Sequence, residues 1–369
     1  MTKGQGEMDP VFCQEESWYL YWLAGVPGIG LRTMQKLMEH FGRASRIYRA
    51  SRGELEKIRG VSSSAADQIL CEEGRENARR SWCALPGKKI QYVSFYSREY
   101  PERLRTLFDP PKQLYVKGKL PDPTRYAVGI VGARECTVYG RDMARLFGYR
   151  LAEAGVQVVS GMAKGVDGWA HQGALESGGD TYAVLGCGVD ICYPAVHQRL
   201  YESILRQGGI LSELPVGMKA RAGFFPMRNR IISALSDGIL VVEAKEKSGS
   251  LITADAALEQ GKDVFVIPGR IGDVLSVGCN RLIRQGAVPV LSPADILEYY
   301  GITEEKTGSE ERILSWKKEI LHMLAQQPVS LPELEQCAGV ERTELMKQLI
   351  KWKKEGRIKE IHRGCFTLF

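Results

Sequence analysis

The 369-residue sequence has no C-x-x-C pair, no apolar run near the roughly 20 residues that span a bilayer, and no basic start followed by an apolar stretch. The absence of an apolar span excludes an integral membrane protein, and the segment from Met1 to Pro10 is polar and acidic, unlike a signal peptide. We therefore expect a cytoplasmic protein without membrane contact, bound metal or cofactor. The nine cysteines are scattered and odd in number, which argues against a disulfide framework or a cysteine zinc site: Cys13, Cys71, Cys83, Cys136, Cys187, Cys192, Cys279, Cys337 and Cys365.

The formal net charge of +6 is only mildly basic, so the distribution of charge is more informative than its sum. One basic cluster occupies the C-terminal segment between Lys347 and Arg363. The other lies in or near expected loops of the middle segment and permits an anionic partner: Arg134, Arg141, Lys164, Arg221, Arg228, Arg230, Lys245 and Lys247.

Residues 1–85 have a helical pattern. An apolar segment, Trp18–Leu23, and a helical period, Leu31–Phe41, flank the interruption Val26-Pro27-Gly28-Ile29-Gly30, and a related interruption begins at Ile58. Apolar-Gly-apolar-Gly between helices is typical of a helix-hairpin-helix, whose backbone N–H groups can bind a DNA phosphate. In the second copy Ser62 replaces the second glycine. A compact helical packing unit is an equally good interpretation.

Residues 90–300 alternate short apolar runs with amphipathic segments, which predicts a parallel sheet with right-handed crossovers. Strands buried on both faces have this uninterrupted apolar pattern. We expect an α/β fold with an extended Rossmann-like sheet, and extra strands or helices at an edge before Val116. The predicted strands are Ala127–Val131, Val156–Ser160, Thr181–Leu185, Gly238–Glu243, Val264–Ile267 and Val288–Leu291.

Residues 310–369 follow a polar linker, Thr303–Glu311, and have three helical periods before two short strand-like runs. The helical periods are Ile313–Ala325, Leu331–Ala338 and Thr343–Glu355. This order predicts a winged helix-turn-helix. Such a domain can bind duplex DNA or another protein, and the sequence favours neither.

The residues after the first two predicted strands suit phosphate binding, because ligands of open parallel sheets lie outside the carboxyl ends of the strands. The first loop contains Gly132 and Arg134, and a helix follows it. The second contains Gly161, Lys164 and Gly165. Glycines allow close backbone approach, a helix start favours an anion, and arginine is a bidentate phosphate donor.

Two further loops extend this set. The stretch Phe224–Ser233 combines Phe225 with Arg228, Asn229 and Arg230, so a base-stacking face lies beside phosphate donors, as in single-strand binders. Alternatively, its phenylalanines are core and its arginines hold acidic side chains such as Glu243. After the fourth predicted strand, Lys247, Ser248 and Ser250 open a helix and can orient a phosphate or sugar.

Other reactive side chains fit structural roles better. Asp167 and His171 are one helical turn apart, which could describe metal ligands or an acid–base pair. A helix N-cap for Asp167 and a buried polar contact for His171 are simpler. Cys187 has no activating base in its loop, so a packed thiol is expected. The sequence shows no nucleophile, base and orienting group together, and we assign no catalytic residue.

Taken in order, the loop motifs resemble the DNA-processing protein A (DprA, or Smf) family. The resemblance covers about residues 100–297. The motifs are VGAR at 131–134, SGMAKGVDGWAH at 160–171, VLGCGVDICYP at 184–194, FPMRNRIIS at 225–233, VVEAKEKSGSLITA at 241–254, IPGR at 267–270 and GCNRLIRQGA at 278–287.

The resemblance implies a protein that binds and protects single-stranded DNA and helps to load the recombinase RecA, notably in natural transformation. It also implies a homodimer formed through the Rossmann-like domain, with contacts near residues 280–296, an N-terminal domain of SAM or helix-hairpin-helix type, and a terminal winged helix. Carried onto this chain, the DNA-binding residues are Arg134, Lys164, Arg228 and Arg230, with Phe225 as a stacking partner.

Three alternatives were compared with this interpretation. A dehydrogenase needs G-x-G-x-x-G after the first strand, and the chain has Gly129, Gly132 and Arg134 there. A phosphoribohydrolase of the lysine-decarboxylase-like type has a similar sheet, but its P-G-G-x-G-T loop is absent and Lys247-Ser248-Gly249-Ser250 departs from it. A sequence-specific regulator using the winged helix would bind a defined duplex site.

Overall fold

The computed structural model describes residues 10–302, 316, 319–321, 323–325, 327–338, 342–354, 357–362 and 364–368. The chain forms two compact units, Met1–Ile302 and Thr303–Phe369. The predicted linker Thr303–Glu311 and the first part of the predicted helical segment Ile313–Ala325 lie outside the described residues. Within the described residues, no helix is long and apolar enough to cross a membrane.

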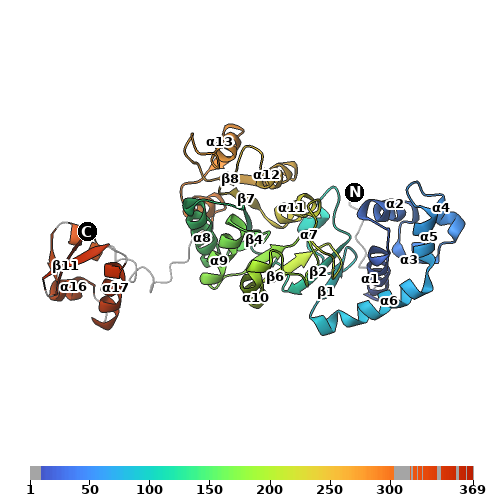
Figure 1. Cartoon of the computed structure of the whole chain (residues 1–369), viewed down its shortest axis with the longest axis horizontal. Coiled ribbons are helices and arrows are strands. Elements are labelled where there is room, and N and C mark those ends of the chain that lie inside the picture. The colour runs from blue at the N-terminus through green and yellow to red at the C-terminus, as the bar shows by residue number, and fades with distance from the viewer. Residues whose placement is uncertain are drawn as a thin grey trace. The chain divides into compact units, whose positions relative to one another are not determined.

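A mostly parallel sheet forms the centre of the first unit, which confirms the predicted α/β class. Its strand order is β1-β2-β6-β5-β4-β3-β7-β8-β9, with β1 antiparallel to β2 and β2 antiparallel to β6 (Figure 1). From β3 the chain therefore adds β4, β5 and β6 on one side and then β7, β8 and β9 on the other. The strands are β1 Gln91–Ser94, β2 Gln113–Gly118, β3 Ala127–Val131, β4 Gln157–Ser160, β5 Thr181–Val184, β6 Gly209–Ser212, β7 Gly238–Val241, β8 Asp263–Val266 and β9 Val288–Pro289.

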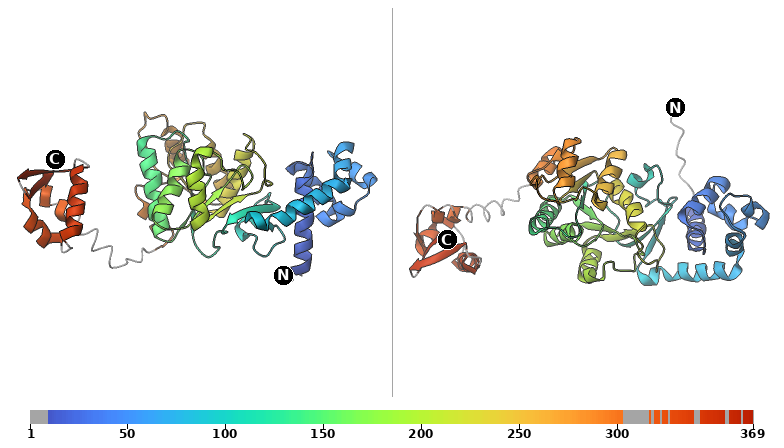
Figure 2. Two further views of the ribbon diagram at one scale, coloured as in Figure 1. Left: turned by 60° about the horizontal axis from the view of Figure 1, so that its bottom comes forward. Right: turned by 45° about the horizontal axis from the view of Figure 1, so that its top comes forward.

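Helices cover both faces of this sheet (Figure 2). One face packs against α8, α9, α10 and α14 through residues such as Val158 and Phe147, and the other against α11, α12 and α13 through Val159 and Ile231. Alternate residues of one buried strand thus enter different cores. The helices are α8 Val138–Glu153, α9 Val166–Glu176, α10 Gln198–Gln207, α11 Phe224–Leu235, α12 Gly249–Glu259, α13 Val277–Arg284 and α14 Pro293–Tyr299.

The six predicted strands agree with β3, β4, β5, β7, β8 and β9 to within two residues at each end. The edge elements expected before Val116 are β1, the short helix α7 (Glu102–Arg105) and β2. Strand β6 was not predicted. Its four residues, Gly209–Ser212, are all buried, like those of the predicted strands β4, β5 and β7.

Six helices precede the sheet and enclose their own core around Leu20, Trp22 and Leu37. The interruption Val26–Gly30 lies between α1 and α2, and Ile58–Ser62 lies between α4 and α5. Aromatic contacts from Tyr21 on α1 to β1 and β2 connect this core to the sheet. The helices are α1 Pro10–Gly25, α2 Leu31–Phe41, α3 Ala44–Arg49, α4 Arg52–Glu56, α5 Ser63–Leu70 and α6 Glu72–Ala84.

The second unit has its own core, which includes Trp316, Leu345, Trp352 and Phe366. Its described elements are β10 Val329–Ser330, α16 Leu331–Ala338, α17 Arg342–Lys354, β11 Ile358–His362 and β12 Cys365–Leu368. The three strands form an antiparallel sheet in the order β10-β12-β11.

Candidate functional site

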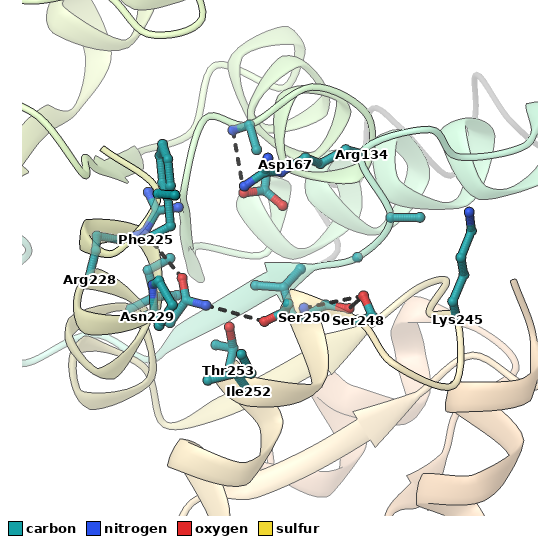
Figure 3. A pocket seen from close by; sticks show the side chains of 18 of the residues that line it. Arg134, Asp167, Phe225, Arg228, Asn229, Lys245, Ser248, Ser250, Ile252 and Thr253 are labelled. Carbon is teal, nitrogen blue, oxygen red and sulfur yellow. Dashed lines mark hydrogen bonds between the residues drawn. The ribbon is translucent and has the colours of Figure 1, made fainter. Parts of the chain in front are cut away.

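A pocket of about 670 Å³ lies at the carboxyl ends of β3, β4 and β7. At β3 the direction in which the chain adds strands reverses, and open α/β sheets bind ligands at such a reversal. In Figure 3 side chains of α11 face those at the start of α12 across the pocket. The lining comprises residues 131–135, Ala163 and Asp167, Tyr193, parts of 220–232 and 245–253, and Leu275.

An aromatic pair under a cation forms one wall. The rings of Phe225 and Tyr193 have centroids 5.6 Å apart, and the Arg134 guanidinium carbon lies 5.2 Å from the centre of the Phe225 ring. A Cβ atom at Gly186 would lie 2.9 Å from that ring, so the loop after β5 needs glycine for this close approach. Arg134 itself is exposed. The wall thus offers an apolar ring face and a positive charge together.

Arg228 lines the pocket but is buried, and two of its three nitrogens, Nε and Nη1, donate hydrogen bonds within the protein. Its Nη1 donates to the Gly161 carbonyl oxygen at 2.8 Å and also to the carbonyl of Val184. Burial lowers the pKa of Arg228 to about 10, and the nearby Asp167 carboxylate opposes that shift. Arg228 therefore connects α11 to the loop after β4 and to the end of β5, and its role as a phosphate donor stays a prediction.

The loop after β4 also differs from the expectation. Asp167 was expected to be a helix N-cap, but α9 begins at Val166 with Gly165 as its N-cap. The Asp167 carboxylate instead accepts hydrogen bonds from the backbone N–H groups of Gly161 and Ala163, at 3.1 and 3.4 Å. Burial raises the pKa of Asp167, and Arg228 opposes the rise. The backbone N–H groups of Gly161 and Ala163 are thus already bound by a side chain of the protein.

The start of α8 also already has a carboxylate of the protein bound to it. The buried Glu243 carboxylate accepts from the backbone N–H of Thr137 at 2.9 Å and from its hydroxyl at 2.5 Å. Any side chain at Gly140 would collide with this carboxylate. The anion expected at this helix start is therefore a side chain of the protein itself.

The start of α12 faces the pocket and gathers several predicted residues. Ser248 accepts a hydrogen bond from the backbone N–H of Ser250 at 3.4 Å, and their hydroxyls lie 2.8 Å apart. Asn229 donates to the Gly249 carbonyl at 3.2 Å from the facing helix. Lys247 is exposed on the same loop (Figure 3 shows Asn229, Ser248 and Ser250).

The structure therefore brings most of the predicted residues to one pocket, but four do not line it. Arg230 lies elsewhere, with its Nη2 2.6 Å from the buried Glu213 carboxylate. Lys164 is exposed on the loop beside the lining residue Ala163. Gly161 and Gly165 belong to the same loop, where neither position has room for a Cβ atom. The lining set contains Gly132, Arg134, Phe225, Arg228, Asn229, Lys247, Ser248 and Ser250.

The lining also contains residues that were not among the predicted site residues, and three of them bear on ligand binding. Arg221 and Lys245 are exposed cations, and Tyr193 is the ring that packs against Phe225. Lys245 lies two residues after one predicted strand and Tyr193 lies in the loop after another, so the sequence places both near strand ends but does not show that their side chains reach the pocket. The contribution of Arg221 depends on the path of an irregular segment, which the sequence does not specify.

The geometry gives little support to metal binding, acid–base catalysis or a nucleophilic thiol in this region. Nδ1 of the buried His171 lies 2.7 Å from the Thr181 hydroxyl, which confirms the expected buried polar contact. Burial lowers the pKa of His171 to about 3 and raises that of the Cys187 thiol to about 11, away from the values of an activated base or nucleophile. In the described parts of the chain, no group of three His, Cys, Asp or Glu side chains could hold a metal ion.

Comparisons with known proteins agree on one family. Residues 91–301 match the family model described as DNA recombination-mediator protein A. Protein Smf of Escherichia coli is 45% identical over 225 residues, which are 61% of this chain and 60% of that relative's length. Protein Smf of a Synechocystis species is 36% identical over 307 residues, 81% of this chain and 77% of that protein.

Two solved structures are also similar. DNA processing protein A from Streptococcus pneumoniae has a TM-score of 0.60 at 34% identity, over 76% of this chain and 97% of that one. DNA processing protein A from Helicobacter pylori, solved for its mode of single-stranded DNA binding, has a TM-score of 0.51 at 32% identity, over 57% of this chain and 95% of that one. The fold, the loop motifs and these matches agree, and the chain belongs to the DNA recombination-mediator protein A family.

Proposed function

We propose that the chain binds single-stranded DNA in the pocket at the carboxyl ends of β3, β4 and β7. The observation that carries this proposal is the set of exposed cations on the pocket wall: Arg134, Arg221, Lys245 and Lys247. None of them forms an ion pair with another residue of the described chain. Unneutralised cations on one concave surface favour a polyanion.

The aromatic wall explains why an unpaired strand suits the pocket. Bases of single strands stack on aromatic rings with little sequence preference, and Phe225 offers such a ring beside Arg134. In a duplex the faces of the bases are covered by the neighbouring base pairs and cannot stack on such a ring. The Helicobacter pylori relative, which binds single-stranded DNA, supports the same ligand here.

A salt series tests the proposal. Affinity for a poly-dT oligomer should fall with salt, because each neutralised phosphate releases counterions with a slope of about 0.7 in the logarithms. Lys245→Gln and Arg134→Gln should each weaken binding and reduce the slope by about 0.7. Lys119→Gln is the matched control, since Lys119 is exposed and follows β2 near the amino end of β6. Equal affinity and slope in all four proteins would refute the pocket assignment.

The wider role follows the family. The proposal includes protection of incoming single-stranded DNA, promotion of RecA loading in recombination and natural transformation, a homodimer formed through the sheet domain near residues 280–296, and a cytoplasmic location. It assigns no catalytic step. The phosphoribohydrolase alternative is not favoured, because the matched relatives are DNA-processing proteins. Release of ribose phosphate from nucleotides by the purified chain would restore it.

The proposal divides the chain into a helical domain of SAM or helix-hairpin-helix type at 1–85, a Rossmann-like DNA-binding domain at 90–300 and a winged helix at 310–369. The hairpin of β11 and β12 after α17, which pairs with β10 in one antiparallel sheet, supports the winged-helix assignment. Duplex DNA and protein remain the two candidate partners of that domain.

A further inference from the structure

A group of aromatic and cationic side chains lies on the first turns of α8 and α9. Tyr139 is 52% exposed on α8, beside Val138, which is 65% exposed, and Trp169 is 37% exposed on α9. The Arg141 guanidinium carbon lies 5.7 Å from the centre of the Trp169 ring, so both helices contribute to one surface. We name Val138, Tyr139, Arg141 and Trp169 the helix-start patch.

The helix-start patch begins close to the pocket. Helices α8 and α9 follow β3 and β4, whose following loops both line the pocket. These loops touch, because a Cβ atom at Gly165 would lie 2.5 Å from the carbonyl oxygen of Arg134. The exposed side chains of Arg134 and Lys164 therefore lie on loops between the pocket and the patch.

A polynucleotide needs a route beyond the pocket. A volume of about 670 Å³ is in the size range of small-molecule sites, so most of a longer strand must lie outside it. The loops toward the helix-start patch contain exposed cations, and the only carboxylates on its two first turns and their preceding loops are Glu135, Asp142 and the buried Asp167. Arg141 and Asp142 form an exposed pair at 2.8 Å, and such pairs are weak enough for a phosphate to replace the carboxylate.

We infer that a single strand leaving the pocket crosses the helix-start patch, where its bases stack on Trp169 and Tyr139. The inference rests on the proposed function and extends the site beyond the pocket. Exposed aromatic rings beside arginine are the combination with which single-strand channels hold bases without reading sequence. A protein partner is the competing occupant, and the exposed cations Arg134 and Lys164 on the intervening loops favour the strand.

Oligomers of two lengths test this route. Trp169→Ser and Tyr139→Ser should each weaken binding of an oligo-dT of about 20 nucleotides by about fivefold, the equivalent of about 1 kcal/mol, while binding of about 5 nucleotides is unchanged. An abasic oligomer of the longer length should bind the parent and both variants equally, because it has no bases to stack. Phe108→Ser is the control for an exposed aromatic elsewhere on the surface, and should bind like the parent.

Intrinsic fluorescence gives a second measurement, because Trp169 is exposed, whereas Trp22, Trp316 and Trp352 are buried and Trp18 and Trp82 are half-buried. The longer oligomer should quench the parent, and Trp169→Phe should lose most of that quenching. If both serine variants bind the longer oligomer as the parent does while Arg134→Gln weakens it, the pocket proposal stands and the route is refuted. If the parent binds neither oligomer, both proposals fail. Unchanged DNA affinity with altered self-association would make the patch a protein interface and refute the route.

Discussion

Nη1 of Arg228 lies 2.8 Å from the carbonyl oxygen of Gly161, so that a side chain of α11 holds the loop that follows β4. Any side chain at Gly161 would collide with this guanidinium. The same Nη1 also donates to Val184, at the end of β5. One buried cation thus connects three segments around the pocket.

Substitutions of Arg228 and Arg134 should affect different properties, the first the stability of the fold and the second the binding of DNA. Arg228→Gln removes a buried cation that balances Asp167 and hydrogen-bonds two carbonyls, so the free energy of unfolding should fall by about 3 kcal/mol. Arg134→Gln changes an exposed side chain and should leave stability nearly unchanged while weakening poly-dT binding. Urea denaturation and an oligomer titration measure both quantities. An Arg228→Gln protein as stable as the parent would contradict the structural role.

The sequence predicted the pocket through local features. Three of the four predicted binding segments follow strands whose apolar runs are evident, β3, β4 and β7, and parallel strands place those loops at one edge. The helical state of residues 224–235 was not recognised. Residues two apart on a helix point about 200° apart, so Arg228 and Arg230 cannot both face one pocket once α11 is known. Treating that stretch as a loop made the two arginines look equivalent.

The partners of the charged groups could not be predicted, because they are distant in sequence. Glu243 and Thr137 are 106 residues apart, and Arg230 and Glu213 belong to different elements. Which cations remain exposed depends on these pairings, and a single sequence does not specify them. The same limit explains why Lys245 and Tyr193 were missed, since exposure toward a pocket is a property of the folded loops.

Gly140 and Gly249 offer a matched pair of substitutions. Gly140→Ala places a methyl group against the Glu243 carboxylate and should displace it from Thr137, which lowers the free energy of unfolding by about 2 kcal/mol. Gly249→Ala meets no atom within 4 Å at the start of α12, and should be neutral or stabilise by up to about 1 kcal/mol. Thermal and urea unfolding compare the two. Equal effects would show that the contact between Glu243 and α8 is not tight.

The pair of Arg230 with Glu213 should respond to a double-mutant cycle. Glu213→Met leaves the Arg230 guanidinium without its carboxylate in a largely buried position and should cost about 3 kcal/mol. Adding Arg230→Met should recover much of that loss, because neither charge then remains unpaired. The double variant should bind poly-dT like the parent, since Arg230 does not line the pocket. Weaker binding by a stable double variant would return Arg230 to the DNA-binding set.

His171 should make stability depend on pH in a defined direction. Burial lowers its pKa to about 3 from 6.5, and His197 and Arg228 nearby also disfavour the charged form. Between these values the unfolded chain binds a proton that the folded chain does not, so this group should lower the free energy of unfolding by about 1.4 kcal/mol for each pH unit of acidification. The contribution of His171 is complete above pH 6.5 and is lost as the pH falls toward 3.

His171→Asn removes this titration, while asparagine can still hydrogen-bond the hydroxyl of Thr181. Urea unfolding of the parent and the variant between about pH 4.5 and pH 6.5 should give two lines of different slope, with the parent steeper by about one proton. Titration of the other histidines and of the carboxylates is common to both proteins and cancels in the difference. Parallel lines would mean that His171 accepts a proton in the folded protein, which would make it available for the acid–base chemistry that its burial otherwise opposes.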